Sequence, residues 1–185
     1  MPNLTKSRRL IISGISGSGK TTLGKALEKR GFQKIPNVVT RLRRSGERAR
    51  ENIFIDDKTF RCWRKEGRLA MCHKTNGVWH DILQKHLNSI RNSRHLIYFD
   101  KSVPSANELI KLLPDVKFSL IYLLPPSFRL LYDHLKLREK DIGMAKKEIY
   151  QRFFEEIHWL KQGAHLPYVY VVNDKIERIV HFINS

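Results

Sequence analysis

Cysteine and long apolar runs are both scarce in this chain. Its 185 residues include two cysteines, Cys62 and Cys72, whose spacing matches no zinc-binding pattern. No segment reaches the roughly 20 apolar residues that a membrane-spanning helix needs, and the apolar run at 10–12 is too short for a signal peptide. We therefore expect a soluble cytoplasmic protein with free thiols and no membrane partner.

Acidic residues are scarce relative to basic ones. The 35 Lys and Arg exceed the 18 Asp and Glu, which gives a formal net charge of +17. Such an excess attracts polyanions, whether nucleotides, phosphorylated metabolites or nucleic acid, without choosing among them. It is equally typical of solubilising charge scattered along helix faces. Nucleic acid therefore stays an alternative partner that the sequence does not favour.

Internal repeats, low-complexity tracts and linkers rich in Pro, Gly or Ser are also absent. We therefore expect residues 1–185 to form a single domain. No Ser-His-Asp or Cys-His arrangement indicates covalent catalysis. His73 and His80 flank a turn signal at 76–77, where each can contact a substrate or serve a structural role.

The strongest motif is a phosphate-binding loop. Residues 14–21 read Gly-Ile-Ser-Gly-Ser-Gly-Lys-Thr, which fits G-x-x-x-x-G-K-[ST]. The apolar run at 10–12 predicts a strand before it, and Leu23, Ala26 and Leu27 predict a helix after it. Glycines let successive backbone N–H groups point inward, and the start of a helix favours an anion.

This motif predicts ATP and Mg²⁺ as ligands. Lys20 is expected to reach the β- and γ-phosphates, and the Thr21 hydroxyl to ligate Mg²⁺. The expected ATP-binding residues are Gly14, Ser16, Gly17, Ser18, Gly19, Lys20, Thr21 and Thr22.

Strand and helix patterns alternate along the rest of the chain. Strands are predicted at 9–13, 95–99, 118–124 and 168–172, and helices at 20–30, 57–66, 81–91, 105–113, 127–138, 145–162 and 174–183, with an irregular stretch at 37–52. This order predicts an α/β sandwich of three layers, with a parallel sheet covered by helices on both faces. Ligands of such folds bind at the carboxyl ends of the strands, where the phosphate-binding loop also falls.

Asp100 falls at a strand end as well. A carboxylate there can hold Mg²⁺ or the water around it. An aspartate that caps the next helix occupies the same kind of position, so both interpretations stay open.

Two basic segments are candidates for phosphate binding. Residues 40–50 carry five arginines, whose planar guanidinium groups bind phosphate oxygens in pairs. A solvated loop or a nucleic-acid site has the same composition. The second segment spans 136–152 and carries Lys136, Arg138, Lys140, Lys146, Lys147 and Arg152. It can place positive charge over a transferring phosphoryl group, or it can be an exposed helix face.

Taken in order, these segments resemble the guanylate-kinase-like branch of the nucleoside monophosphate kinases. The similar segments are the loop at 14–22, Thr40-Arg41-x-x-Arg44-x-Gly46-Glu47, the acidic strand end at 97–100, the strand ending in Leu-Pro-Pro-Ser after 120, and Val-Val-Asn-Asp at 171–174. They extend over nearly the whole chain. The loop alone occurs in many unrelated proteins, whereas the ordered set is much more specific.

The resemblance implies a P-loop NTPase fold with two functional insertions. An acceptor-binding region would lie at about 37–91 and a lid at about 136–152. Arg138 and Arg152 of the lid would close over the γ-phosphate, and Asn173 would lie near the adenine of ATP. The implied catalytic residues are Lys20, Arg41, Arg138, Arg152 and Asp100, with Thr21 and Asp100 on the metal.

The acceptor side departs from the family pattern. The resemblance implies that Arg41 and Arg44 grip the acceptor's phosphate, and the acceptor-binding candidates are Arg41, Arg44, Asn52, Trp79 and Asp81. Ala70 stands about where the family has a guanine-reading glutamate. The stretch 73–77 instead resembles a turn of the ribose 1,5-bisphosphate phosphokinases.

The sequence therefore predicts an ATP-dependent phosphotransferase with a phosphorylated small-molecule acceptor. A nucleoside monophosphate such as GMP or dGMP is the first candidate. The alternatives are a ribose 1,5-bisphosphate phosphokinase and a catalytically weak adaptor that binds nucleotide or nucleic acid.

Overall fold

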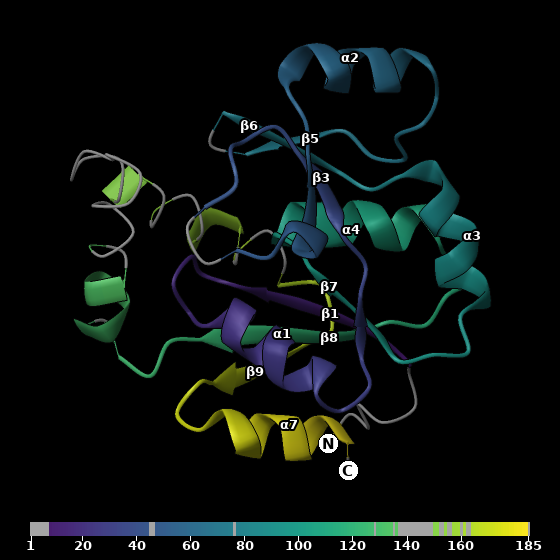
Figure 1. Ribbon diagram of the computed structural model, residues 1–185. Helices are drawn as coiled ribbons and strands as arrows, with labels where there is room; N and C mark the ends of the chain where they lie inside the picture. Colours follow the sequence, from purple (N-terminus) through teal and green to yellow (C-terminus); the bar gives the residue numbers. More distant parts are fainter. Residues whose placement is uncertain are drawn as a thin grey trace.

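A parallel five-stranded sheet forms the centre of the molecule (Figure 1). The computed structural model describes residues 8–44, 47–75, 77–127, 129–134, 136, 150–151, 154, 157–159, 161 and 164–184. Within them the strand order is β2-β7-β1-β8-β9, and every neighbouring pair is parallel. The strands are β1 (Arg9–Gly14), β2 (Gln33–Lys34), β7 (Ile97–Asp100), β8 (Ser119–Leu124) and β9 (Tyr168–Val172).

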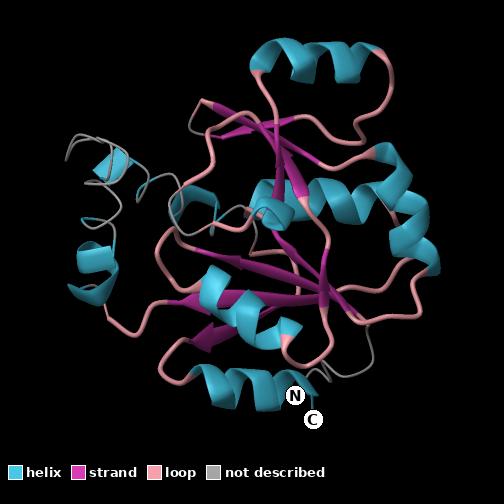
Figure 2. Ribbon diagram, in the orientation of Figure 1, coloured by secondary structure: helices cyan, strands magenta, loops and turns pink. Residues whose placement is uncertain are grey.

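Helices cover both faces of this sheet (Figure 2). On one face lie α1 (Lys20–Glu28) and α7 (Ile176–Asn184), and on the other lie α3 (Gln84–Asn92) and α4 (Val103–Leu112). Each side has its own apolar core. Strand β1 serves both cores, because Leu10 and Ile12 face α1 while Ile11 faces α4. A strand buried on both faces reads as a continuous apolar run, which explains the pattern at 10–12.

A second, smaller sheet lies above the first and forms the region expected to bind the acceptor. Its order is β4-β3-β6-β5, built from β3 (Asn37–Val39), β4 (Asn52–Phe54), β5 (His73–Thr75) and β6 (Val78–Asp81). A 3₁₀ turn at Ala49–Glu51 leads into β4, and α2 (Asp57–Lys65) packs on the sheet through Phe60. Asp56 begins α2, because its carboxylate accepts a hydrogen bond from the Thr59 amide.

The structure confirms the predicted three-layer sandwich and corrects part of the element assignment. Residues 37–52, predicted to be irregular, include strand β3, and the helix predicted from 81 begins at Gln84 because β6 extends to Asp81. Strands of three or four residues are too short to show an alternating pattern. The helix predicted at 127–138 is helical at 129–134 and at 136, whereas the region predicted as a lid, 136–152, and most of the helix predicted at 145–162 lie outside the described residues.

Two other predictions can be compared with the described residues. Cys62 and Cys72 are both free thiols, as expected. Among the residues that the structure describes, no helix is long and apolar enough to cross a membrane.

Candidate functional site

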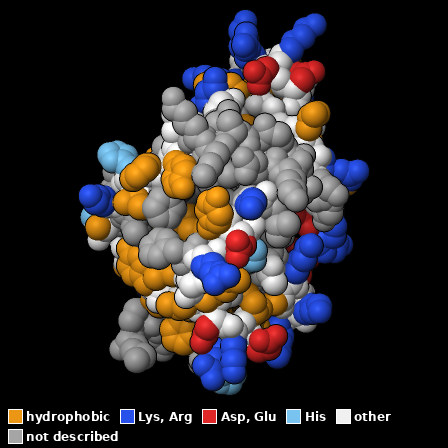
Figure 3. Space-filling view, turned by 90° about the vertical axis from the view of Figure 1, so that its left-hand side faces the viewer, with side chains coloured by type: hydrophobic (Ala, Val, Ile, Leu, Met, Phe, Trp, Pro, Cys, Tyr) orange, Lys and Arg blue, Asp and Glu red, His pale blue; other side chains and the backbone are white. Residues whose placement is uncertain are grey.

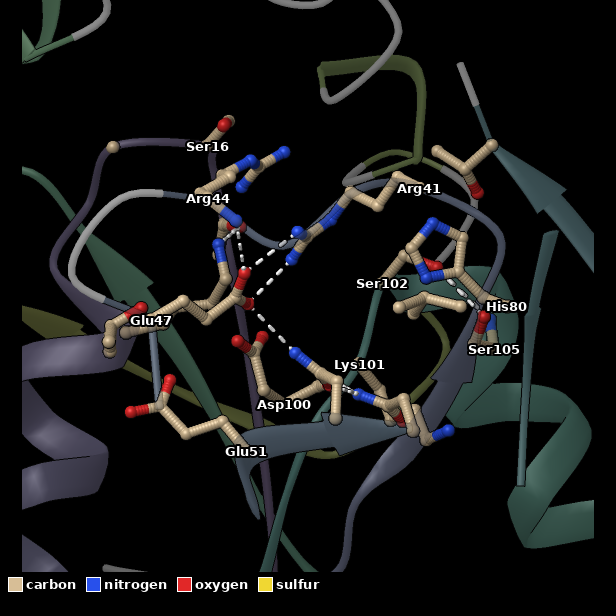
Figure 4. A pocket seen from close by; sticks show the side chains of 18 of the residues that line it. Ser16, Arg41, Arg44, Glu47, Glu51, His80, Asp100, Lys101, Ser102 and Ser105 are labelled. Atoms are coloured by element: carbon tan, nitrogen blue, oxygen red, sulfur yellow. Dashed lines mark hydrogen bonds and ion pairs between the residues drawn. The ribbon is translucent and has the colours of Figure 1, made fainter. Parts of the chain in front are cut away.

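The carboxyl ends of β1 and β7 open into a cavity of about 430 Å³ (Figure 4). The phosphate-binding loop, the start of α1, the stretch after β3 and the start of α4 all contribute side chains to its wall. The small sheet contributes residues of β4, β5 and β6. The cavity therefore lies where parallel strands of the main sheet meet the acceptor region, as expected for a ligand site in this fold class.

The backbone of the phosphate-binding loop can be formed only with glycine at two positions. Gly14 and Gly19 have φ angles of 148° and 96°. A Cβ atom on Gly14 would collide with the backbone oxygen of Leu123, and one on Gly19 would collide with the amide of Asn173. The glycines of the motif are thus required by close contacts as well as by dihedral angles.

The loop is equipped to hold phosphate. Lys20 Nζ lies across it and donates to the backbone oxygens of Gly14 at 2.6 Å and Ile15 at 3.1 Å. Ser18 Oγ is buried and has no hydrogen-bond partner among the described residues. An ammonium group and backbone N–H groups at the start of a helix, in a loop that lines the cavity, fit a triphosphate.

Two side chains from distant segments form hydrogen bonds with backbone oxygens of this loop. Asn173 Nδ2 donates to Ser18 O at 2.8 Å, so the residue after β9 is fixed against the loop. His134 Nδ1 lies 3.0 Å from Gly17 O, and it must donate because a carbonyl oxygen only accepts. The sequence predicted Asn173 as a nucleotide-binding residue and gave no signal for His134. Contact of Asn173 with adenine stays a prediction.

Thr21 and Asp100 line the same cavity and are suited to magnesium. Ser102, not Asp100, caps α4, since the Ser102 side chain accepts from the Ser105 amide. The carboxylate of Asp100 is therefore not used as a helix cap. In the part of the chain described, no group of three or more His, Cys, Asp or Glu side chains forms a complete metal site. Mg²⁺ commonly binds one or two protein oxygens together with substrate phosphates and water, so these two residues fit it.

Arg41 lies in the cavity wall and is held by Glu47. Its guanidinium donates two hydrogen bonds to the carboxylate, at 2.8 and 2.6 Å. The same carboxylate accepts from the Arg44 amide at 3.1 Å and from Asn52 Nδ2 at 2.9 Å. Burial alone would raise the pKa of Glu47, but the bonds from Arg41 and the Arg44 amide lower this pKa to about 2.

This arrangement brings together three of the predicted acceptor-binding residues. Arg41, Arg44 and Asn52 all line the cavity (Figure 4). Glu47 also lines it and fixes their relative positions, a role that the sequence-based assignment left out although Glu47 belongs to the quoted motif. A planar guanidinium oriented by a carboxylate is well suited to bind phosphate oxygens.

The structure does not bring Trp79 and Asp81 to the cavity. The Trp79 ring stacks on Phe60 with 5.4 Å between ring centroids, within the apolar core of the small sheet. Asp81 is fully buried, and its Oδ1 accepts from the amides of Met71 at 2.7 Å and Ile82 at 2.6 Å. Burial raises the pKa of Asp81 to about 6, although these bonds oppose the shift.

Two residues that the sequence-based site assignment omitted face the cavity instead. His80 alternates with Trp79 along β6, so its imidazole lines the wall, and burial lowers its pKa to about 4. Lys101 follows Asp100 at the end of β7 and is only 4% exposed. Burial lowers the pKa of Lys101 to about 8, although nearby carboxylates raise it. Strand alternation was the available signal for His80, whereas the sequence gave none for Lys101.

Arg138 and Arg152, the predicted lid arginines, lie outside the described residues. Of the two ends of that segment, Lys136 and 150–151 are described. The proposed closure over the γ-phosphate stays a prediction.

Comparison with known proteins points to one kind of enzyme. No family model matches the chain. Guanylate kinase from Myxococcus xanthus is 28% identical over 180 residues, which cover 95% of this chain and 83% of that protein. Guanylate kinase from Coxiella burnetii is 26% identical over 194 residues, which cover 98% and 89% of the two chains.

A solved structure shares the fold of this chain. The crystal structure of guanylate kinase from Anaplasma phagocytophilum aligns with a TM-score of 0.71 at 19% sequence identity, covering 96% of this chain and 82% of that one. At such an identity the alignment shows the fold. The sequence and the fold are both similar to those of guanylate kinases, and these comparisons support a nucleotide kinase, which is a phosphotransferase.

Proposed function

We propose that the protein transfers the γ-phosphoryl group of ATP to a phosphate oxygen of a small phosphorylated acceptor. One observation carries the proposal: a single cavity is lined both by the phosphate-binding loop with Lys20 and by Arg41 held in place by Glu47. The two groups provide separate phosphate-binding positions within the same space.

The residues act by positioning and by charge. An oxygen of the acceptor's phosphate attacks the γ-phosphorus, the bond to the bridging oxygen breaks, and ADP leaves with the bonding electrons. Lys20 and the loop amides stabilise the charge on the donor phosphates, while Arg41 and Arg44 orient the attacking phosphate. Mg²⁺ bound near Thr21 and Asp100 would neutralise charge on the β- and γ-phosphates. No covalent intermediate with the protein is required.

GMP or dGMP is the first candidate acceptor, because both curated relatives are guanylate kinases. Ribose 1,5-bisphosphate is the second, because alanine stands at position 70, about where the resemblance places a guanine-reading glutamate. Ala70 has no side chain that can accept a hydrogen bond, and the cavity wall carries Lys101, which is a donor only. The guanine amino group is itself a donor, so neither residue can accept from it.

A coupled assay of ADP release tests the proposal. ATP and MgCl₂ are supplied with GMP, dGMP, AMP or ribose 1,5-bisphosphate in separate reactions. ADP formed above the ATP-only rate with at least one acceptor is expected. The absence of ADP with every acceptor contradicts phosphoryl transfer, and steeply salt-dependent binding of RNA in that case favours the adaptor alternative.

A further inference from the structure

The cavity has a second cationic region, formed where β7 ends and α4 begins. Lys101 lies there, with His80 of β6 and with Ser102 and Ser105 of α4 in the same wall (Figure 4). The Lys101 amide donates to Ile12 O at 3.1 Å, which fixes its backbone to β1. The backbone of Lys101 is therefore held at a defined place, beside the polar side chains of His80, Ser102 and Ser105.

The side chain of Lys101 is largely buried, and its ammonium group has no direct partner among the described residues. It makes no ion pair and no side-chain hydrogen bond with any residue that the structure describes, although it is 4% exposed. A buried charge of this kind is costly unless something pairs with it. A ligand that enters the cavity can supply that partner.

Three carboxylates face Lys101 from the surrounding elements, but each has another role. Asp81 Oδ1 accepts two backbone amides, and Glu108 Oε1 accepts from the Cys72 amide at 3.4 Å. Asp100 lines the cavity beside Thr21, at the magnesium position. All three act on Lys101 through space only.

The remaining titratable groups near Lys101 are histidines and one further lysine. His80 is neutral at pH 7 because burial lowers its pKa to about 4. His73 and His86 also face Lys101, and burial lowers the pKa of each. Lys34, at the end of β2, adds a second cation to the same cavity.

The start of α4 also favours the binding of an anion. It does so through hydroxyl groups and not through free amides, because Pro104 has no N–H and the amides of Ser105 and Ala106 donate to the side chain and the backbone oxygen of Ser102. Ser102 and Ser105 are hydrogen-bonded to each other at 3.0 Å, so both hydroxyls are held in place at the cavity wall. An ammonium group and two ordered hydroxyl groups on one wall are complementary to an anion.

We propose that Lys101 and the amino end of α4 form a subsite for a second anionic group of the acceptor. The acceptor would then be a small phosphorylated molecule with a phosphate or carboxylate at its other end. This inference rests on the proposed function, since Arg41 and Arg44 are taken to bind the acceptor's first phosphate. Lys101 would thus determine which acceptors are bound.

Calorimetric titration without ATP tests the subsite independently of turnover. Three ligands share one sugar skeleton and differ at a single carbon: ribose 5-phosphate, ribose 1,5-bisphosphate and 5-phosphoribonate. The second ligand carries a second phosphate and the third carries a carboxylate. We expect the wild-type protein to bind at least one of the doubly anionic ligands about 10- to 100-fold more tightly than ribose 5-phosphate, as one charged hydrogen bond is typically worth.

Variants then test whether Lys101 causes the tighter binding of the doubly anionic ligands. Lys101→Met should reduce it to about twofold or less and leave the affinity for ribose 5-phosphate nearly unchanged, whereas Lys101→Arg should retain most of it. Lys111→Met is the matched control, because Lys111 is an exposed lysine on the same helix. Melting curves of each variant check that the fold is intact.

Three outcomes would overturn the subsite. They are equal binding of all three ligands by the wild-type protein, no binding of any of them, and equal weakening of all three by Lys101→Met. The first two need no variant, so a poorly folded variant does not protect the proposal. If the preference is found but no acceptor yields ADP in the coupled assay, the subsite stands and the proposed function fails.

Discussion

Arg41 is fixed on two sides before any ligand arrives. Glu47 accepts two hydrogen bonds from its guanidinium, and the Phe54 ring centroid lies 5.4 Å from its Cζ atom. An arginine that is already ordered loses less side-chain freedom when it binds phosphate. Glu47 is therefore a positioning residue for the acceptor, and its own charge is part of that function.

The charge of Glu47 should make stability depend on pH in a defined window. Its pKa is lowered from 4.5 to about 2 on folding, so its stabilising effect is present above pH 4.5 and is lost as the pH falls toward 2. The difference in free energy of unfolding between wild type and Glu47→Gln should shrink across that window. Urea denaturation at pH 5, 4 and 3 measures it.

The same variant should raise the KM for the acceptor about 10-fold and leave the KM for ATP nearly unchanged, because Glu47 holds Arg41, Arg44 and Asn52 on the acceptor side and no residue of the phosphate-binding loop. A constant difference in stability from pH 5 to pH 3, or equal increases in both KM values, would contradict this role of Glu47.

Lys20 should be required for turnover and not for folding. Its ammonium group contacts only backbone oxygens of the loop among the described residues, so Lys20→Ala removes no packing from either core. We expect kcat to fall by about 10²- to 10³-fold or more, as for loss of one strong electrostatic contact to the transition state. ADP release measures the rate, and circular dichroism checks the fold. Lys25→Ala, an exposed lysine on the same helix, should keep nearly full activity.

The sequence predicted residues whose role follows from a motif and missed those whose role follows from packing. Lys20 and Arg41 were both found because a loop motif or a resemblance names them. Trp79 was predicted to bind the substrate, and His80 was given either a substrate contact or a structural role. In the structure Trp79 packs against the core of the small sheet, whereas His80 lines the cavity. Position along a strand decides between such neighbours, and the register of a four-residue strand cannot be read before its partners are known.

At the scale of elements, the acceptor region is tied to the helix that follows the phosphate-binding loop. Glu28 of α1 accepts from Tyr98 at 2.9 Å and from Arg48 at 2.7 Å, and Arg48 also donates to Glu51 at 2.8 Å. This chain of bonds connects α1, β7 and the 3₁₀ turn before β4. It lowers the pKa of Glu28, despite the opposing effect of burial.

The long elements were predictable and the short ones were not. Strand β9 was predicted at 168–172 and has these bounds, because five alternating apolar and aromatic residues give a clear pattern. Strands β3, β4 and β5 have three residues each, and their partners lie elsewhere in the chain. These strands form because they pair with one another in the small sheet, and the local sequence of each segment does not indicate which partners it will have.

Close packing of α1 against β7 yields a prediction opposite to helix propensity. Alanine forms helices better than glycine by about 1 kcal/mol, which by itself favours Gly24→Ala. However, a Cβ atom on Gly24 would lie 2.6 Å from Tyr98 Oη and 3.0 Å from its ring. Tyr98 is buried and bonded to Glu28, so it cannot move freely.

We therefore expect Gly24→Ala to destabilise the protein by about 1–3 kcal/mol, the usual effect of overpacking. Thermal or urea denaturation measures the loss, and adding Tyr98→Phe should recover part of it by removing the nearest atom. Stabilisation by Gly24→Ala alone would show that the contact is relieved more easily than the distances indicate.

At the scale of the whole molecule, the question is where the net charge of +17 acts. On the face drawn in Figure 3, Lys and Arg side chains are dispersed around the molecule and are interspersed with acidic ones. The cavity gathers five cationic side chains of the described residues against three acidic ones, Glu47, Glu51 and Asp100, and the cations are Lys20, Lys34, Arg41, Arg44 and Lys101. This distribution favours small phosphorylated ligands over an extended polyanion.

Ligand binding should therefore show as a gain in thermal stability. A ligand present at about 100 times its Kd stabilises the folded state by about 2.7 kcal/mol. For a chain of this size that corresponds to a rise in melting temperature of roughly 5–10 °C. Magnesium with ATP should produce such a rise in the wild-type protein and in Lys25→Ala, and a much smaller one in Lys20→Ala.

The comparison with RNA decides between an enzyme site and a polyanion surface. If dispersed charge were the main determinant of binding, RNA would raise the melting temperature as much as ATP with magnesium does. That effect would vanish with added salt and would not depend on Lys20, because each phosphate contact releases counterions. A rise with RNA alone, equal in wild type and Lys20→Ala, would exclude the loop as the principal binding site. A rise in melting temperature that is specific to ATP and depends on Lys20 would show that the basic residues act mainly by binding phosphorylated ligands in the cavity.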